Sequence, residues 1–342
     1  VFGMGEEALP FVMILAPMFV AMGYDAVVGI VCSYVATQIG FGTSWMNPFS
    51  LAVAQGIAGI PVMSGAAFRI ALWVFFTGLT IVFTMRYASK IKKNPRLSVA
   101  YESDAYYRNE FSAEGREELP FTLGHKLVLL TLLATIVWTI WGVLVKGYYI
   151  PEIASQFFVM GFVAGIIGVV FKLNGMELND IAKSFDKGAA DLLGAALCVG
   201  MAQGIILVLG GTSATDGTVL NTILHTIGES MKGLPPMISA WLMYVFQSVF
   251  NFFVVSGSGQ AALTMPIMAP TAELIGLSKQ IAVLAYQFGN GFAEMFWPTS
   301  CALGCGLMGV PINKWYKFIT PLFGMVLVLE VVFMTIAVAI GY

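Results

Sequence analysis

The sequence FNFFVVSGSGQAALTMPIMAP, residues 250–270, is apolar at both ends and polar in the middle. Its five central residues, Ser256 to Gln260, are small or polar and do not favour a continuous helix. Backbone polar groups at membrane depth must be satisfied internally, so broken helix survives there only inside protein or beside a wet cavity. The stretch therefore predicts the tip of a re-entrant helical hairpin. The alternative is a helix kink packed by small residues.

The composition of the whole chain predicts a membrane protein. Of its residues, 58% are hydrophobic and only 11% are charged, whereas soluble domains contain about 25% charged residues. A helix that crosses a bilayer needs about 20 mostly apolar residues. The clearest such stretches are 127–145, 157–171, 189–209 and 322–340. We therefore predict an all-α polytopic membrane protein in contact with the lipid bilayer, with no nucleic acid as a partner.

One segment, 86–120, is soluble in character and holds seven of the 17 Lys and Arg residues. Positive charge next to membrane spans stays in the cytoplasm, so this segment is predicted to be a cytoplasmic linker. A cysteine at Ser98 or Ser112 should therefore escape an impermeant reagent added from outside. The expected location is a bacterial cytoplasmic (inner) membrane.

Distant parts of the chain resemble one another. PFSLAVAQGIAGIP (48–61) and PTSCALGCGLMGVP (298–311) align without gaps and share six of fourteen residues. Further back, the pairs "GF" (40–41 and 291–292) and "AP" (16–17 and 269–270) follow the same order. The predicted topology makes these repeats inverted, which is typical of secondary transporters with broken helices. Because the second copy is preceded by far more sequence, we expect N-terminal scaffold helices to be missing from this chain.

The two hairpin tips are the first candidate binding groups. We expect Gly3–Gly5 and Gly257–Gly259 to form non-helical tips near the bilayer centre, approaching from opposite sides, with a new helix starting near Ala261. A helix N-terminus presents free N–H groups that suit carboxylates. The candidate residues are Gly3, Gly5, Glu6 and Glu7 in the first tip and Ser256, Gly257, Ser258, Gly259 and Gln260 in the second.

The second element of each repeat is also predicted to be a broken helix. GFGTSWMNPFS (40–50) and QFGNGFAEMFWPTS (287–300) place small, polar and proline residues inside apolar segments. The candidate polar lining is Thr43, Ser44, Asn47, Asn290, Thr299 and Ser300. Na⁺ could bind at Thr43, Ser44 and Asn47, or at Ser256 and Ser258. A simple proline kink is the alternative, and no other metal or cofactor is expected.

Charged residues at membrane depth are costly and usually functional. Glu294 is the best case, because it lies among bulky apolar residues close to Pro298. Arg69 lies inside the apolar segment VMSGAAFRIALWVFF and could meet a carboxylate or extend to the outer interface. Glu330 lies alone in the last apolar segment, and no role is assigned to it.

These segments resemble a known family. The blocks FGMGEEALPF, GYD, NPF…AGIP and SGSGQAALTMPIMAP look like the YfcC-type family, which is grouped with ArcD-type arginine/ornithine antiporters and anaerobic C4-dicarboxylate carriers. SGSGQAALTMPI also resembles the hairpin tip of divalent anion/sodium symporters, with SGSG where those have Ser-Asn-Thr. The resemblance implies an ion-transporter-superfamily fold, a homodimer, and a transport domain that slides as an elevator.

This interpretation divides the chain into six parts. They are a transport part of repeat 1 (1–61), a transmembrane helix (62–85), the cytoplasmic linker (86–120), scaffold helices of repeat 2 (121–188), a transport part of repeat 2 (189–312) and a C-terminal transmembrane helix (313–342).

Three functions compete. The first is a secondary transporter of amino acids, preferably cationic ones such as arginine or ornithine, working as an antiporter or as a symporter coupled to Na⁺ or H⁺. The acid excess of Glu6, Glu7 and Glu294 favours this substrate. The second is a C4-dicarboxylate carrier, in which helix N-termini and Arg69 bind two carboxylates. The third is a membrane enzyme, which we reject because no nucleophile–base pair, HExxH or CxxC motif is present.

Overall fold

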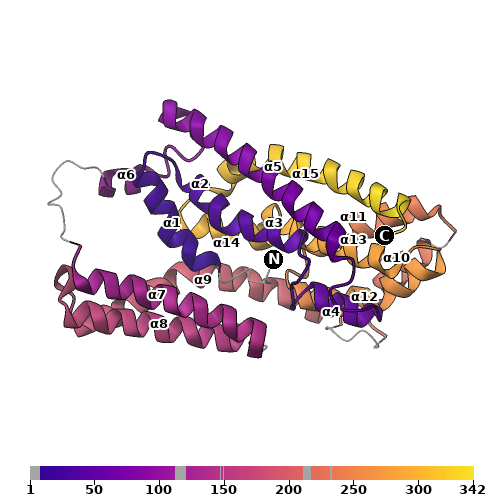
Figure 1. Cartoon of the computed structure of the whole chain (residues 1–342), viewed down its shortest axis with the longest axis horizontal. Coiled ribbons are helices and arrows are strands. Elements are labelled where there is room, and N and C mark those ends of the chain that lie inside the picture. Colours follow the sequence, from indigo (N-terminus) through magenta and orange to yellow (C-terminus); the bar gives the residue numbers. More distant parts are fainter. Residues whose placement is uncertain (1–7, 112–120, 147, 149, 211–216, 232) are drawn as a thin grey trace. The chain divides into compact units, whose positions relative to one another are not determined.

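We describe a computed structural model of the 342-residue chain. The described residues are 8–111, 121–146, 148, 150–210, 217–231 and 233–342, and within these ranges every regular element is a helix. The chain divides into two compact units, one formed by residues 1–112 and 194–342 and the other by residues 113–193. Figure 1 shows the helices coloured along the sequence. The predicted all-helical class is confirmed.

The N-terminal half of the first unit contains α1 (Leu9–Ala21), α2 (Ala26–Ile30), the π-helical turn η2 (Val31–Val35), α3 (Ala36–Gly42), α4 (Leu51–Ala58), α5 (Ala66–Lys93), η3 (Pro95–Leu97) and α6 (Ala105–Phe111). Its C-terminal half contains α10 (Val219–Ser230), α11 (Pro236–Phe250), α12 (Gly257–Leu274), α13 (Lys279–Gly291), η6 (Ala293–Met295), α14 (Pro298–Leu307) and α15 (Ile312–Ala339).

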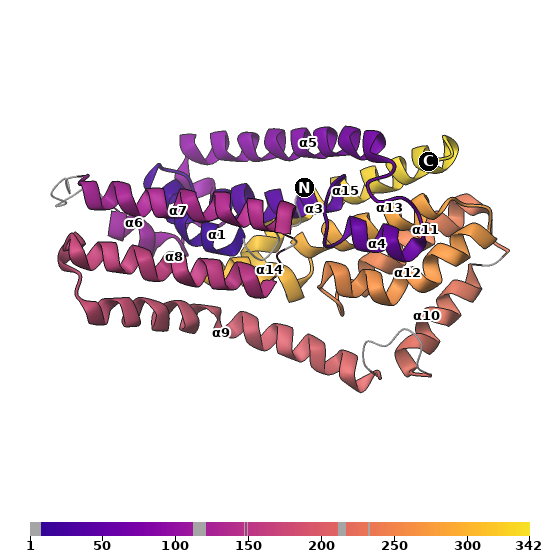
Figure 2. The same ribbon diagram turned by 60° about the horizontal axis from the view of Figure 1, so that its bottom comes forward.

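The second unit is built from two long helices that lie side by side, as Figure 2 shows. They are α7 (Leu123–Trp141), which continues into η4 (Gly142–Lys146), and α8 (Ile150–Val170), followed by η5 (Leu173–Gly175). Helix α9 (Leu178–Val208) begins in this unit and ends in the first. The Thr139 hydroxyl on α7 donates to Gln156 Oε1 on α8 at 2.9 Å and joins the pair through a buried hydrogen bond.

Helices α5 and α15 are long and apolar enough to cross a membrane. They run antiparallel: the Tyr342 hydroxyl, just after α15, donates to the Gly65 carbonyl at the start of α5 at 2.9 Å. Further along, the rings of Phe83 and Phe318 pack with centroids 5.5 Å apart. Helix α5 starts at Ala66 and extends to Lys93, so the first residues of the predicted linker continue the spanning helix.

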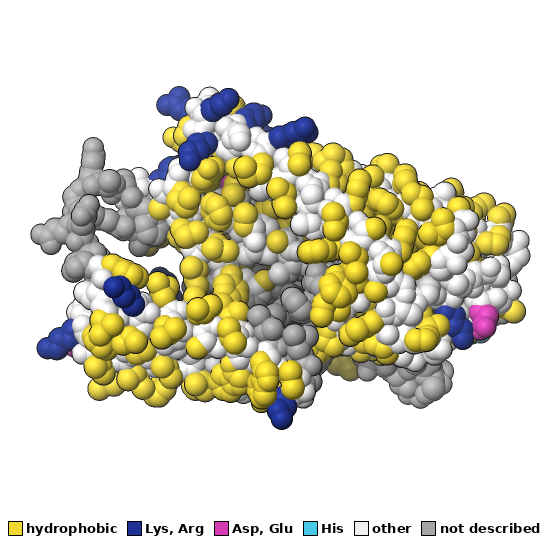
Figure 3. All heavy atoms as spheres, viewed as in Figure 1, with side chains coloured by type: hydrophobic (Ala, Val, Ile, Leu, Met, Phe, Trp, Pro, Cys, Tyr) yellow, Lys and Arg dark blue, Asp and Glu magenta, His cyan; other side chains and the backbone are white. Residues whose placement is uncertain are grey.

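The outward surface of this pair is apolar, and its charge is concentrated at one end. Figure 3 shows hydrophobic side chains over most of the visible face and Lys and Arg gathered at the C-terminal end of α5. That end carries Lys90, Lys92 and Lys93. Cations are favourable at a helix C-terminus and suit the cytoplasmic side of a membrane.

The predicted interruption of residues 250–270 is confirmed, but the predicted tip is wrong by several residues. Helix α11 ends at Phe250 and α12 begins at Gly257, so the non-helical segment is 251–256. The Ser256 hydroxyl accepts a hydrogen bond from the Gly259 N–H at 3.2 Å and caps α12. Because this cap starts the helix early, Gly257–Gly259 form its first turn, and the helix does not begin near Ala261. The other predicted tip, Gly3–Gly5, lies outside the described residues.

The two predicted broken helices are also interrupted. Helix α3 ends at Gly42 and α4 begins at Leu51, while α13 ends at Gly291 and α14 begins at Pro298. Asn47 Oδ1 accepts hydrogen bonds from the N–H groups of Phe49 (2.8 Å) and Ser50 (3.1 Å) in the first gap. Pro298 suits the first position of a helix, where its missing N–H costs nothing.

Aligned glycines of the two segments adopt the same backbone conformation. Gly59 after α4 has φ 69° and its counterpart Gly309 after α14 has φ 62°. The Ile60 N–H donates to the Gln55 carbonyl at 3.1 Å, and the aligned Val310 N–H donates to Cys305 at 2.9 Å. Gly23 and Gly276 pair in the same way, with φ of 85° and 81°. The similarity of the two segments therefore extends from sequence to local structure.

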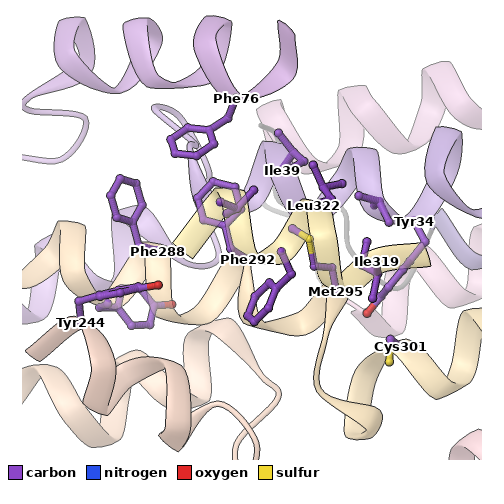
Figure 4. Packing of buried hydrophobic residues seen from close by; sticks show 14 of the residues in the cluster. Tyr34, Ile39, Phe76, Tyr244, Phe288, Phe292, Met295, Cys301, Ile319 and Leu322 are labelled. Carbon is purple, nitrogen blue, oxygen red and sulfur yellow. The ribbon is translucent and has the colours of Figure 1, made fainter. Parts of the chain in front are cut away.

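Two glycines bring the broken helices into backbone contact. A Cβ atom at Gly291 of α13 would lie 2.2 Å from the backbone nitrogen of Gly42 of α3. Beside this crossing, Phe76, Phe288 and Phe292 point toward one another (Figure 4), and Phe76 lies 4.8 Å from Phe292, centroid to centroid. The crossing and the aromatic cluster form the centre of the core.

We expect Gly291→Ala to destabilise the protein by about 1–3 kcal/mol, because its methyl group must displace backbone rather than a flexible side chain. Gly56→Ala in α4 is the matched control, since no atom lies within 4 Å of the added methyl group. Thermal unfolding in detergent should lower the midpoint for the first variant only. Equal midpoints for both variants would contradict the close crossing.

A polar cluster joins the turn between α1 and α2 to α5 and to the segment after it. Asp25 accepts hydrogen bonds from the hydroxyls of Tyr87 (2.6 Å) and Ser98 (2.7 Å). Asp104 accepts one from the Ala26 N–H at 2.9 Å. Burial raises the pKa of Asp104 to about 6, while its hydrogen bond from Ala26 opposes the shift. Burial likewise raises the pKa of Asp25.

This cluster predicts a defined pH dependence of stability. The pKa of Asp104 is about 6 in the folded protein against an ordinary 3.8, so folding strengthens proton binding there. The stabilisation of the folded state that comes from this stronger proton binding by Asp104 is fully present below about pH 4 and is lost as the pH rises through 6. Asp104→Asn should remove this part of the pH slope, measured as the unfolding midpoint between pH 4 and 7. The exposed neighbour Glu102→Gln is the control and should keep the slope; a wild-type slope in Asp104→Asn would refute the assignment.

Candidate functional site

A buried cluster of amide side chains joins the interrupted hairpin to α13. Gln260 on α12 donates through Nε2 to the carbonyl oxygen (2.9 Å) and to Oε1 (2.8 Å) of Gln247 on α11. Its Oε1 accepts from Asn251 Nδ2 at 3.2 Å and from Asn290 Nδ2 at 3.0 Å. All four side chains are fully buried. Gln260 is therefore the centre of a network that fixes the hairpin against α13.

Gln287 links α13 to the other interruption. Its Nε2 donates to the backbone carbonyls of Phe41 (3.1 Å) and Ser44 (2.7 Å), at the point where α3 ends. Its Oε1 accepts a hydrogen bond from Nη1 of Arg69 on α5. The amide thus adds hydrogen bonds to carbonyls at the end of the broken helix, of which that of Phe41 also accepts from the Ser44 N–H at 3.2 Å.

The start of α12 packs directly on the first interruption. A Cβ atom at Gly257 would lie 3.0 Å from the Phe41 ring and 3.4 Å from Ser50 Cβ. The Tyr286 hydroxyl on α13 donates to the Gly257 carbonyl at 2.6 Å. Three segments that are distant in sequence, 41–50, 251–260 and 286–290, therefore meet at one buried site.

Several predicted site residues hold the backbone in place. The Thr43 hydroxyl donates to the Ile39 carbonyl at 2.7 Å at the end of α3. Asn47 Oδ1 caps the turn before α4, and Ser256 caps α12. Ser258 and Gly259 lie in the first turn of α12. The hydrogen bonds of Thr43, Asn47 and Ser256 thus satisfy backbone groups at the interruptions.

Other polar atoms of the site are buried without a hydrogen-bond partner among the described residues. Besides Trp45 Nε1, Gln247 Nε2 and Ser300 Oγ, these are the five atoms Asn47 Nδ2, Ser50 Oγ, Asn251 Oδ1, Asn290 Oδ1 and Thr299 Oγ1. Buried polar atoms normally have partners, so each such atom needs an explanation. Four of the five are oxygens, which could accept hydrogen bonds from an ammonium group or contact a hard cation.

Glu294 lies at the second interruption. It is half-buried in η6, between α13 and α14, and its backbone carbonyl accepts a hydrogen bond from the Tyr34 hydroxyl at 2.9 Å. Ser300, in the first turn of α14, is buried. The acidic pair predicted to complement Glu294, Glu6 and Glu7, lies outside the described residues, as do Gly3 and Gly5.

Sequence reasoning missed part of the site. Gln247, Asn251 and Gln287 are not in the predicted set, although amide residues within apolar segments are a recognisable sign of interhelical hydrogen bonds. Ser50, inside the predicted break, was also omitted. Glu330, which the sequence left isolated, is buried and accepts a hydrogen bond from the Tyr244 hydroxyl at 2.6 Å, joining α15 to α11.

Comparison with known proteins identifies the family. The sequence profile described as "DcuC: C4-dicarboxylate anaerobic carrier" matches residues 1–339. The chain belongs to this family. The DcuC family consists of carriers, so the chain is an integral membrane protein of a transporter family.

Two relatives and one solved structure are similar to this chain. An Escherichia coli (strain K12) protein named "Putative basic amino acid antiporter YfcC" is 51% identical over all of this chain and 68% of its own length. A Haemophilus influenzae protein is 31% identical over 99% of this chain and 65% of its own length. The chain thus spans about two thirds of these relatives. The Alcanivorax borkumensis YdaH transporter aligns with 97% of this chain and 74% of its own, with a TM-score of 0.49 and 16% identity.

We expect Gln260→Leu to lower the free energy of unfolding by at least about 2 kcal/mol, because it leaves Asn290 Nδ2 without a partner and Asn251 Nδ2 with only its 3.5 Å hydrogen bond to the Val254 carbonyl. Thr264→Val is the control. Its hydroxyl is equally buried but bonds only within its own helix, to the Gln260 carbonyl at 2.8 Å. The control should cost less than about 1 kcal/mol. Equal unfolding midpoints for the two variants would show that the network carries no stability.

Proposed function

We propose that this protein is a secondary active transporter of amino acids, with a preference for cationic ones such as arginine and ornithine. One observation carries the proposal: two interrupted helical segments and a hairpin meet at a buried site lined by amides and hydroxyls. Irregular backbone at membrane depth is tolerated where it lines a binding cavity. In secondary transporters such interruptions hold the substrate and the coupling ion.

The matched local structure of the two segments supports an inverted repeat and an elevator-type cycle. Under this proposal residues 1–61 and 189–312 belong to a transport domain, residues 121–188 to a scaffold that forms a homodimer, and segments 62–85 and 313–342 to flanking spans. The linker 86–120 then lies in the cytoplasm, and the protein as a whole lies in a bacterial inner membrane. The cluster of cations at the end of α5 agrees with that orientation.

The charges of the site support an amino acid with a cationic side chain. An amino-acid carboxylate could bind the N–H groups at the start of α12. The unpaired oxygens of Asn251 and Asn290 could accept hydrogen bonds from ammonium groups or coordinate Na⁺, and Glu294 would supply the negative charge. The name of the Escherichia coli relative, a basic amino acid antiporter, agrees with this choice. As a secondary transporter, the protein would couple the movement of its substrate to that of Na⁺, H⁺ or a second amino acid.

A C4-dicarboxylate carrier is the second candidate. It is favoured by the description of the family and by Arg69, a fully buried cation in the first unit. Two carboxylates could then bind Arg69 and the start of α12.

A thermal-shift screen of purified protein separates the two candidates. Ligands that bind only the folded state raise the unfolding midpoint by mass action. We expect arginine, ornithine and lysine to raise it, and succinate, fumarate and malate to have no effect, with Na⁺ tested in parallel. Stabilisation by the dicarboxylates alone would replace the first candidate by the second, and no response to any of them would reject both.

Glu294→Gln should abolish uptake of cationic amino acids into proteoliposomes, or remove its dependence on the coupling cation, while the protein still folds. The exchange keeps the shape of the side chain and removes its charge. Glu273→Gln is the control, because Glu273 is exposed and pairs with Lys279 at 3.2 Å on the surface. Wild-type uptake by Glu294→Gln, with unchanged pH and Na⁺ dependence, would remove Glu294 from the site.

A further inference from the structure

Arg69 is the most unusual charged residue of the first unit. Its side chain lies near the start of α5 and is fully buried, with 0% exposure. Nη1 donates to Gln287 Oε1, and the guanidinium carbon lies 5.8 Å from the centroid of the Tyr342 ring. No carboxylate of the described residues forms an ion pair with it. A buried cation without a counter-charge is costly, and in membrane helices such residues are usually functional.

The two nitrogens that remain free have a specific geometry. Nε and Nη2 are buried and form no hydrogen bond of good geometry among the described residues. Besides Gln287, the Tyr342 hydroxyl also contacts the guanidinium group. These two atoms form one edge of the planar guanidinium group, while Gln287 occupies the opposite nitrogen, Nη1. That edge offers two parallel N–H groups, which match the two oxygens of a carboxylate.

Arg69 is connected to the site by a short chain of contacts. Gln287, its partner, also donates to the carbonyls of Phe41 and Ser44. The Phe41 ring packs on Gly257 at the start of α12. The glutamine that organises the first interruption thus also holds Arg69, through Nη1, on the side opposite the free edge.

From this geometry we propose that Arg69 is a carboxylate-binding group of the transport site, holding one substrate carboxylate through Nε and Nη2. For an amino-acid substrate, which carries a single carboxylate, Arg69 then takes the place of the N–H groups at the start of α12. The inference rests on the proposed transport function, but not on the choice between its two substrates, because amino acids and C4-dicarboxylates both carry the required group. Gln287 is a positioning residue that fixes the plane of the guanidinium.

The test compares each carboxylate ligand with a counterpart in which every carboxylate is removed or replaced by an amide. The pairs are arginine and agmatine, succinate and succinamide, and, as a minimal probe, propionate and propionamide. Wild-type protein should bind the acid of a pair at least about tenfold more tightly, as expected for a charged, two-point hydrogen bond. In Arg69→Gln this ratio should fall to below about threefold. Arg96→Gln, at an exposed position in η3, is the control and should keep the wild-type ratio.

Failure of the inference and failure of the proposed function give different results. A folded Arg69→Gln protein that keeps the tenfold ratio overturns the inference even if arginine or succinate remains a substrate. If wild-type protein binds neither arginine nor succinate, the proposed function fails, and the propionate pair alone decides the role of Arg69. A ratio near one in wild-type protein for every pair that binds, including propionate, also overturns the inference.

A measurement on wild-type protein covers the case in which Arg69→Gln does not fold. Phenylglyoxal modifies arginine, and mass spectrometry of peptides gives the rate at each residue. Propionate, but not propionamide, should slow modification of Arg69 several-fold and leave Arg96 unaffected. An unchanged rate at Arg69 overturns the inference. Absence of any modification there does so as well, because a substrate-binding group must become accessible during transport.

Discussion

The structure of the first unit depends on how the backbone groups freed by helix interruptions are satisfied. In an apolar surrounding each unpaired carbonyl or N–H group costs free energy, and water cannot compensate. Gln287 meets this constraint for the first interruption by donating to two carbonyls at once. Gln260 joins both arms of the hairpin to α13. The amides therefore determine where the helices can break and which segments meet.

This constraint also explains why the site is compact. Tyr286, Gln287 and Asn290 lie within about one turn of α13 and reach two different segments, the start of α12 and the end of α3. Gly257 and Gly291 carry no side chain, which allows those segments to approach α13 and each other closely. Small residues at crossings and polar side chains between helices are the usual means of packing in membranes.

Much of this arrangement could be predicted from sequence. The apolar composition, the polar interruption at 256–260 and the paired segments around Pro48 and Pro298 indicated helices, a hairpin and two breaks, because these features act locally. The start of α12 was misplaced because the two glycines, Gly257 and Gly259, suggested a non-helical tip, whereas the capping hydrogen bond to Ser256 starts the helix before them. Gln247 and Gln287 carry a recognisable signal as amides within apolar segments, but their partners and the burial of Arg69 are set by long-range packing that no local pattern encodes.

The crossing of α3 and α13 has a mechanical consequence. Gly42 and Gly291 join the N-terminal and C-terminal halves of the first unit through backbone atoms, with no side chain between them to act as a hinge or a sliding layer. Rocking of one half against the other would separate this contact and break the hydrogen bonds from Gln287 to Phe41 and Ser44. A cycle that preserves the crossing must therefore carry both interruptions together as one rigid body, so that access to the site changes at the border of that body and not through its middle.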